Sequence, residues 1–516
     1  MKTQNPYLLL LLSVPLVGFG QTSREKGTNI ENKLPNIVYI LTDDLGYGDV
    51  SVYNPQAKTS TPNIDRLASQ GIRFTDAHSP SAVCTPTRYG ILTGRYCWRS
   101  RLPVGVLNGY SESLIEKERT TVASFLKRKG YSTAVVGKWH LGLDWIQKKG
   151  SENTAPVSAA EINASIIKSI DPSNIDFSVP PTDGPLNHGF DYSFILPASL
   201  DMPPYCYLSN DKLTSPLDGT TPGSNPDNGT TGSFWRGGLM AKGFDFEQVT
   251  PTFTQNAISF LKKQSRSGKP FFLYLPYPSP HTPWMPTADF NGSSKAGQYG
   301  DFVNMVDNEV GKVLKTLTEM GLDDNTIVFF TSDNGPFWKP PFIEKFDHRA
   351  AYIYRGMKAD AFEGGHRIPF IVRWPGKIKP ASQCSEPTTL TNLLATCSSI
   401  LNTKLSDNEG EDSFSILPLL LGNVSEYKRP EAIINHSSRG LFAVRSGDWK
   451  LILGLGSGGF SKPESYQPKT GEAPGQLFNI KDDPSETINL YLQNPDKVKE
   501  LSAILKKYQE TGRSRF

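Results

Sequence analysis

Four continuous apolar runs, separated by helical patterns, constrain the fold of this chain more than any other feature. The runs cover residues 36–44, 132–140, 270–281 and 326–335, and each ends in charged or polar side chains. Runs without polar alternation are typical of strands buried on both faces, as in a parallel sheet flanked by helices. The segments between them place apolar residues at helical spacing. The alternation predicts an α/β fold with a large, mixed, mostly parallel sheet sandwiched by helices.

The polar residues that close these runs belong to the types that bind metal ions or transfer protons. In open α/β sheets, ligands bind outside the carboxyl ends of the strands, so we expect these side chains to meet at one edge. One acid pair after a strand often only caps a helix, but four such ends in one sheet favour a reaction site. The acids and the asparagine among them offer only oxygen donors, which favours Ca²⁺, or Mg²⁺, over zinc. The residues are Asp43, Asp44, Lys138, His140, His281, Asp333 and Asn334.

The stretch 81–94 places a cysteine at the start of a predicted helix. Pro86 suits the first helical turn and Thr85 is an acceptable N-cap. Cys84 would then lie at the positive end of the helix dipole, where thiols are activated. Considered without its neighbours, Cys84 is more simply a half-buried structural thiol. The cations near it, however, form a pocket suited to an oxyanion of sulfur or phosphorus. Those cations are Arg88, Lys138, His140, His281 and Lys358.

Length and composition give the domain plan and exclude one class of partner. A chain of 516 residues exceeds one ordinary core. We expect a catalytic domain at 35–425, with a loop-rich insertion at 150–245, and a smaller C-terminal α+β subdomain at 426–516. The 54 basic and 51 acidic residues leave a net charge of +3, which does not indicate a nucleic-acid binder.

The N-terminal residues and the cysteines predict the compartment. Residues 1–20 combine a basic Lys2 with a short apolar stretch, the pattern of a signal peptide, and residues 21–34 form a polar tether. No later segment is apolar enough to span a bilayer, so we expect a periplasmic or secreted protein without a stable membrane anchor. Five cysteines are an odd number in an oxidising compartment, so at least one is unpaired or modified; Cys384 and Cys397 could pair, and the pairing of Cys97 and Cys206 stays open.

An ordered set of motifs resembles a known family. CTPTR followed by YGILTGR, with GYSTAVVGKWH downstream, resembles the two signature motifs of the type I sulfatases, in the alkaline phosphatase superfamily. The resemblance continues from NIVYILTDD through SDNG, RGMK and EGGHRIPFIVRWPG to GDWKLI, and so covers about residues 35–490. The commonest version of the motif has Ser where this chain has Thr87, which keeps the hydroxyl.

The resemblance implies a mechanism and assigns roles. It implies that a maturation enzyme oxidises Cys84 to formylglycine, whose hydrate is the nucleophile. Ca²⁺ would be bound by residue 84 together with Asp43, Asp44, Asp333 and Asn334. Arg88 and Lys138 would hold the hydrate and the sulfate. His281 and Lys358 would contact the sulfate and the leaving oxygen, with His281 as the acid, and His140 would take the proton that lets the aldehyde reform. Separately from the resemblance, Trp284 could line a carbohydrate pocket, and His366 and Arg367 are further substrate-binding candidates.

The resemblance also implies a substrate class. We expect a sulfatase that acts on sulfated carbohydrate, with oligosaccharides of an algal glycan such as ulvan or galactan preferred. The alternatives are a glycosaminoglycan or galactose/N-acetylgalactosamine-6-sulfate sulfatase, a phosphonate or phosphate ester hydrolase of the same superfamily, and an inactive protein that binds sulfated glycans. The complete set of candidate catalytic groups argues against the last of these.

Overall fold

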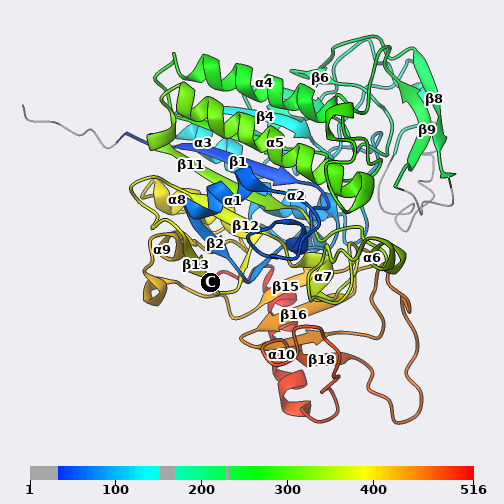
Figure 1. The fold of residues 1–516 in the computed structure, drawn as a ribbon, viewed down its shortest axis with the longest axis vertical. Coiled ribbons are helices and arrows are strands. Elements are labelled where there is room, and N and C mark those ends of the chain that lie inside the picture. Colours follow the sequence, from blue (N-terminus) through cyan, green and yellow to red (C-terminus); the bar gives the residue numbers. More distant parts are fainter. Residues whose placement is uncertain (1–32, 152–168, 227–231) are drawn as a thin grey trace, which may run out of the picture. The chain divides into compact units, whose positions relative to one another are not determined.

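A ten-stranded sheet forms the centre of the fold in this computed structural model, which describes residues 33–151, 169–226 and 232–516 (Figure 1). The strand order is β13-β2-β12-β11-β1-β10-β4-β5-β6-β7. The expected signal peptide and nearly all of the tether lie outside the described residues, and residues 34–516 form one compact unit. The strands are β1 (Asn36–Thr42), β2 (Ile72–Phe74), β4 (Ser132–Lys138), β5 (Tyr192–Leu196), β6 (Leu208–Ser209), β7 (Lys212–Leu213), β10 (Phe271–Pro276), β11 (Thr326–Ser332), β12 (Phe370–Arg373) and β13 (Ser382–Cys384).

The four apolar runs form the middle of this sheet. Strand β1 pairs in parallel with β10 and β11, and β10 pairs in parallel with β4. Antiparallel β12 borders this group on one side, and parallel β5 borders it on the other. The predicted α/β fold with a mixed, mostly parallel sheet is confirmed.

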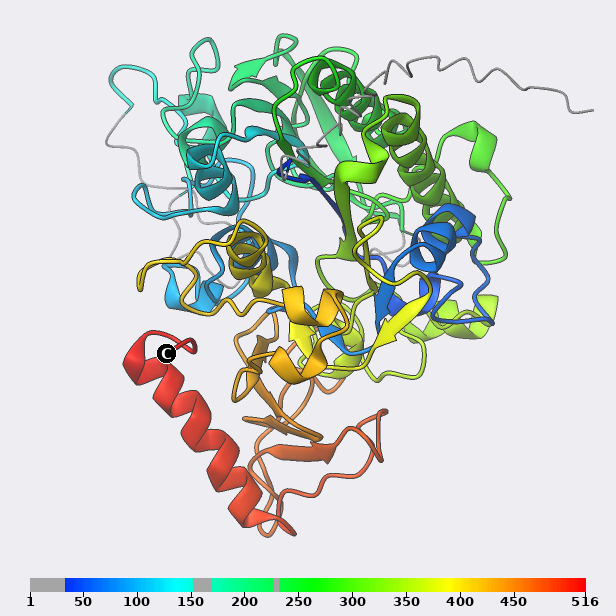
Figure 2. The same cartoon turned by 90° about the vertical axis from the view of Figure 1, so that its left-hand side faces the viewer.

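Helices cover both faces of the sheet, which is why the central strands are apolar on both sides (Figure 2). In β1, Ile37, Tyr39 and Leu41 face one layer, while Val38 and Ile40 face the other. The first layer contains α2 (Cys84–Thr93), α3 (Val122–Arg128) and α8 (Leu393–Ile400); the second contains α1 (Pro62–Ser69), α4 (Val249–Gln264) and α5 (Gly297–Glu319). The shorter helices are α6 (Pro340–Phe346), α7 (Glu363–His366) and α9 (Leu417–Leu420).

The C-terminal residues build a second, antiparallel sheet with one helix packed on it. Helix α10 (Pro495–Thr511) presents Leu501, Ile504, Leu505 and Tyr508 at helical spacing toward this sheet. The observed strands and helix agree with the α+β content predicted for 426–516, while the domain boundary stays a prediction. The four strands are β15 (Ile433–His436), β16 (Phe442–Ser446), β17 (Trp449–Ile452) and β18 (Gln476–Asn479).

The segment 150–245 contributes more regular structure than its loop-like composition predicts. Strands β5, β6 and β7 extend the main sheet, and β8 (Gly219–Ser224) pairs with β9 (Trp235–Met240) as a separate two-stranded sheet. The remaining pair joins β3 (Ala77–His78) to β14 (Thr388–Thr389). All five cysteines are buried and free, so Cys384 and Cys397 do not pair. Within the described ranges, no helix is both long and apolar enough to cross a membrane.

Candidate active site

The carboxyl ends of four adjacent strands bring the predicted polar residues together. Strands β11, β1, β10 and β4 are neighbours in the sheet, run parallel, and end at the same edge. Asn334 Nδ2 donates to Asp44 Oδ1 at 2.7 Å, and the Asp44 amide donates to Asp333 Oδ1 at 3.3 Å. Lys138 Nζ lies 2.5 Å from Asp43 Oδ2. The residues that follow separate strands therefore share one buried site.

Helix α2 delivers Cys84 to this site. The helix begins at Cys84 with Val83 as the N-cap, two residues before the predicted N-cap Thr85. Thr85 does not cap it, because its hydroxyl donates to the His140 carbonyl at 3.0 Å. Burial raises the pKa of Cys84 to about 11, against the opposing effect of nearby Lys138 and Lys358. Desolvation therefore outweighs the nearby positive charges at this helix start, and the position does not by itself activate the thiol.

Arg88 crosses the site from the next turn of α2. Its Nη2 lies 3.0 Å from Asp43 Oδ2 and 2.8 Å from Asp333 Oδ2, and its Nη1 donates to the Lys138 carbonyl at 2.9 Å. The side chain is fully buried. The guanidinium thus fixes the ends of β1, β11 and β4 relative to one another through charge-assisted hydrogen bonds.

The acidic group fits a hard divalent cation. Buried Asp43 Oδ1 and Asn334 Oδ1 have no hydrogen-bond partner among the described residues, and buried oxygens of this kind are normally satisfied. Burial, followed by the charge of Asp43, raises the pKa of Asp333 to about 7. Burial also opposes ionisation of Asp43, but Lys138, His281 and Arg88 hold the pKa of that carboxyl well below its usual range. The donor set of carboxylate and amide oxygens matches Ca²⁺ or Mg²⁺.

His140 is positioned as a neutral base. Its Nε2 lies 2.7 Å from the Leu107 carbonyl, which can only accept, so Nε2 carries the proton. Its Nδ1 is buried and has no hydrogen-bond partner in the part of the chain that the structure describes. Burial, reinforced by the charge of Lys138, holds the pKa of His140 well below its usual range. The ring therefore presents an unprotonated Nδ1 inside the site.

His281 and Lys358 lie beside Asp44, one member of the acidic group. His281 Nδ1 donates to the Thr282 carbonyl at 2.6 Å, which leaves Nε2, 3.7 Å from Asp44 Oδ2, to face the site. Lys358 Nζ lies 2.9 Å from Asp44 Oδ1. The ammonium and the imidazole thus lie beside Asp44, where each can contact a bound anion.

Two residues of the site were missed by sequence reasoning. Asp201 is buried beside His281, with Oδ1 3.9 Å from His281 Nδ1, and its Oδ2 is 2.5 Å from Arg236 Nη1. Ser199 Oγ accepts from Lys138 Nζ at 3.0 Å. These residues follow β5, where FILPASLD is a fifth apolar run that ends in polar side chains. That pattern was the signal that could have found them.

Three predicted substrate-binding residues do not line an open site. Trp284 is only 5% exposed and packs among Tyr299, Trp338 and Phe342. A Cβ on Gly232 would lie 2.0 Å from the indole of Trp284, so the main chain closes over that ring. The indole thus packs within the core, and the substrate-binding role of Trp284 stays a prediction.

His366 and Arg367 belong to a second buried cluster instead. His366 Nδ1 lies 3.0 Å from His78 Nδ1, and its Nε2 lies 3.0 Å from Lys450 Nζ in β17. Arg367 Nη2 lies 2.6 Å from Glu363 Oε2. The polar atoms of His366 thus connect β3 and α7 to the C-terminal sheet, and the substrate contact assigned to His366 and Arg367 stays a prediction.

Comparison with known proteins decides the family. The sulfatase family profile matches residues 35–403. The chain belongs to the sulfatase family. An N-acetylgalactosamine-6-O-sulfatase of Bacteroides thetaiotaomicron is 34% identical over 539 aligned positions, covering 98% of this chain and 99% of the relative. Arylsulfatase A of Bos taurus is 32% identical, covering 90% of this chain and 84% of the relative.

The solved structures confirm the alkaline phosphatase-like fold of this sulfatase. A structure described under the metabolism of multiple glycosaminoglycans by Bacteroides thetaiotaomicron superposes with a TM-score of 0.77 at 32% identity. The match covers 93% of this chain and 100% of that one. The sulfatase is thus a sulfuric ester hydrolase.

Asp201 is expected to matter for turnover through its contact with His281. Asp201→Asn removes a buried charge 3.9 Å from the imidazole and loosens Arg236, so kcat/KM for sulfate release should fall about 10- to 100-fold, a typical result of misplacing a catalytic group. Steady-state kinetics with a soluble sulfate ester measure this. Exposed Asp218→Asn, in the same segment, is the control. Wild-type kcat/KM in Asp201→Asn would refute the role.

Proposed function

We propose that this sulfatase removes the 6-sulfate from galactose-type sugars, N-acetylgalactosamine or galactose, in oligosaccharides of a sulfated polysaccharide. The relative from Bacteroides thetaiotaomicron that bears the name N-acetylgalactosamine-6-O-sulfatase aligns over nearly the whole of both chains and supports this choice. The structural neighbour described under glycosaminoglycan metabolism supports the same class. The preference for an algal glycan such as ulvan or galactan stays a prediction, which the substrate screen below includes.

The observation that carries the sulfate-ester chemistry of the proposal is the buried set of cations and acids around Cys84. Cys84 is a poor thiol nucleophile, because its pKa of about 11 keeps it protonated near neutral pH. As a precursor of formylglycine, made by a maturation enzyme, residue 84 would present a hydrate hydroxyl in place of a thiol. Lys138 and Lys358, two of the charges that act on Cys84, would offset the negative charge of a bound sulfate.

The two histidines would divide the proton transfers. His281 directs Nε2 toward the site, and we assign it the proton that the leaving sugar oxygen needs. His140 presents an unpartnered Nδ1, and we assign it the proton of the hydroxyl that remains on residue 84 after sulfate transfer. Release of that proton would reform the aldehyde and expel sulfate. Arg88 would hold residue 84 and the acids in register.

A metal ion belongs to this site in the proposal. Asp43, Asp44, Asp333 and Asn334 would hold it with residue 84, and their oxygen-only donor set favours Ca²⁺, with Mg²⁺ as the alternative. A bound divalent cation supplies charge stabilisation to the sulfate oxygens. The two buried oxygens without hydrogen-bond partners support this assignment.

The location is part of the proposal as well. The apolar pattern of residues 1–20 supports export to the periplasm or beyond, where sulfated polysaccharide fragments are encountered. Edman sequencing of the exported protein, beginning near residue 21, would identify the cleavage site.

A substrate screen tests the function. Mature protein is incubated with N-acetylgalactosamine 6-sulfate, galactose 6-sulfate, 6-sulfated chondroitin disaccharides, ulvan and galactan oligosaccharides, a phosphate monoester and a phosphonate ester. Free sulfate and phosphate are quantified by ion chromatography. We expect kcat/KM for the 6-sulfated galactose-type sugars to exceed that for the phosphorus esters by at least about tenfold, a difference of roughly 1.4 kcal/mol.

Each alternative has its own outcome in this screen. Dominant phosphate or phosphonate turnover would replace the proposal with the phosphorus-ester alternative. Turnover confined to ulvan or galactan fragments would restore the algal substrate. Tight glycan binding without sulfate release from any compound, in protein whose residue 84 is shown to be converted, would identify a glycan-binding protein.

A further inference from the structure

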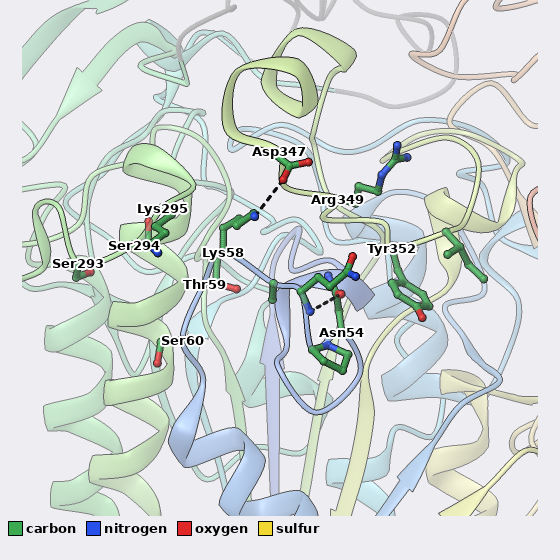
Figure 3. Close-up of a pocket in the computed structure, with 14 residues that line it drawn as sticks. Asn54, Lys58, Thr59, Ser60, Ser293, Ser294, Lys295, Asp347, Arg349 and Tyr352 are labelled. Carbon is green, nitrogen blue, oxygen red and sulfur yellow. Dashed lines mark hydrogen bonds and ion pairs between the residues drawn. The ribbon is translucent and has the colours of Figure 1, made fainter.

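A hollow of about 830 Å³ lies outside the candidate active site (Figure 3). Three segments line it: residues 54–60, 293–295 and 347–353. They follow β1, β10 and β11, the strands that also carry Asp43, Asp44, His281 and Asp333. The hollow therefore belongs to the same edge of the sheet as the site. Its volume lies in the range of small-ligand pockets.

The charged residues around the hollow favour an anion. Lys58, Lys295 and Arg349 are its cations, and Asp347 is its one acid. Lys58 Nζ lies 3.1 Å from Asp347 Oδ2, so the positive and negative charges of this pair offset each other. Lys295 and Arg349 are exposed, and their side chains make no hydrogen bond or ion pair within the described part of the chain. Two cations are thus available to a ligand.

The uncharged lining favours a ligand with many hydroxyl groups. Gln56 and Ser60 are exposed, and their side chains make no hydrogen bond with other described residues. Tyr352 and the 45% exposed Ile353 add an aromatic and an aliphatic surface. Sugars present hydroxyl groups at their edges and C–H groups on their faces, so polar groups beside an apolar surface suit them.

The walls of the hollow are fixed to the segment that follows Asp44. Gly48 N donates to the Ala350 carbonyl at 2.7 Å, and a Cβ on Gly48 would lie 2.1 Å from the Arg349 carbonyl oxygen. This close approach requires glycine and holds residues 349–350 against the 3-10 helix η1 (Tyr47–Asp49). Arg349 is therefore presented from an anchored backbone.

Buried hydrogen bonds link the hollow to the candidate active site. His348 Nδ1 accepts from the Lys58 amide at 3.3 Å, and its Nε2 donates to Asp49 Oδ1 at 2.6 Å. The Tyr299 hydroxyl donates to the other oxygen of Asp49, and its oxygen lies 3.2 Å from the Asp44 carbonyl oxygen. Lys58 is thus separated from Asp44 by three side chains, all of them buried.

We propose that this hollow binds a second anionic sugar of the same saccharide substrate, a sulfated or uronic acid unit distinct from the one that loses its sulfate. The substrate class rests on the proposed function, while the preference for an anionic polyol rests on the two available cations and the polar and apolar walls. Lys295 and Arg349 bind the sulfate or carboxylate group, and Gln56 and Ser60 bind sugar hydroxyls.

The test removes the two available cations and compares a long substrate with a short one. In Lys295→Ala/Arg349→Ala, KM for a chondroitin 6-sulfate hexasaccharide should rise about tenfold, equivalent to about 1.4 kcal/mol, with kcat unchanged. KM for N-acetylgalactosamine 6-sulfate should not change. The tenfold effect should disappear at about 1 M salt, where the Debye length is about 3 Å.

A matched control variant also loses two positive charges, but at another place on the protein. Lys377→Ala/Lys379→Ala removes two exposed lysines that follow antiparallel β12, at the opposite edge of the sheet. It should leave KM for the hexasaccharide unchanged. An equal rise in both double variants, or an equal rise for the monosaccharide in Lys295→Ala/Arg349→Ala, would overturn the proposal.

Direct binding separates this proposal from the proposed function. Affinity electrophoresis on Cys84→Ala protein, in gels with chondroitin 6-sulfate or with unsulfated hyaluronan, needs no turnover. Retardation that is lost when Lys295→Ala/Arg349→Ala is added, and kept when Lys377→Ala/Lys379→Ala is added, would support anion binding in the hollow. This holds even if no sulfate were released. The hyaluronan arm distinguishes carboxylate from sulfate. Equal retardation of all proteins, or none with either polymer, would refute the hollow as an anionic sugar site.

Discussion

Cys84→Ala is expected to abolish sulfate release, with a loss of at least about a thousandfold, as removal of a nucleophile costs in other enzymes. The side chain is buried among Lys138, Lys358, Asp43 and Asp333, whose charges act on it. Helix α2 places this side chain at its first residue, and Arg88 of the next turn contacts two of the same acids. The measurement is sulfate release by the variant and the wild type after co-expression with a maturation enzyme.

Mass spectrometry shows whether residue 84 acts as a modified group or as a thiol. The peptide that contains residue 84 should be about 18 Da lighter than the cysteine form, the change expected when a thiol becomes an aldehyde. A pKa of about 11 leaves only about one thiol in ten thousand ionised at pH 7. Fully active protein with unmodified cysteine would contradict the proposal.

A second cysteine provides the control. Cys397 is fully buried in the apolar core and remote in sequence from the polar strand ends. Cys397→Ala removes a thiol of the same burial, so it should lower stability by about 1 kcal/mol and leave kcat/KM unchanged. Equal loss of activity in both variants would indicate a general packing defect and would remove the argument for Cys84.

The central sheet and the convergence of its strand ends were predictable from the sequence. The reason is local: a strand buried on both faces shows as an unbroken apolar run, and parallel strands must end at one edge. Asp44 and Asn334 illustrate this, because 290 residues separate them in sequence and yet their side chains share a hydrogen bond of 2.7 Å.

Other features depend on partners that sequence patterns do not reveal. Sequence patterns do not show that the His366 ring contacts His78 and Lys450, which are 288 and 84 residues away. Asp201 was missed because β5 has only five residues and lies in a segment with the composition of a loop. The first residue of α2 also differed from the expectation, since the Thr85 hydroxyl finds the His140 carbonyl rather than the helix amides.

Removal of the metal ion is expected to reduce activity at least about a hundredfold, because an ion that stabilises charge on the transferred group contributes several kcal/mol. Dialysis against a chelator, followed by addition of Ca²⁺, Mg²⁺ or Zn²⁺, measures the loss and its recovery. Ca²⁺ should restore activity best. It should also raise Tm, because an ion at a hundred times its Kd stabilises the folded state by about 2.7 kcal/mol.

One substitution distinguishes a weakened ion site from a broken fold. Asn334→Ala removes a side chain that the proposal assigns to the ion and whose Oδ1 has no partner among the described residues, so Ca²⁺ affinity should fall about 10- to 100-fold, and excess Ca²⁺ should rescue turnover. Asp43→Asn removes a charge that pairs with Arg88 and Lys138, and excess Ca²⁺ should not rescue it. Asn325→Ala, beyond the opposite end of β11, is the control and should behave as wild type.

The rescue by Ca²⁺ carries the argument, because a folding defect would not respond to the ion. A variant that lost activity through misplacement of Asp44, which receives a hydrogen bond from Asn334, would stay inactive at every Ca²⁺ concentration. Recovery in Asn334→Ala alone therefore assigns the side-chain oxygen of Asn334 to the ion. Full activity and an unchanged Tm after exhaustive chelation, with no metal detected by mass spectrometry, would instead show that the buried acids serve only to balance Arg88, Lys138 and Lys358.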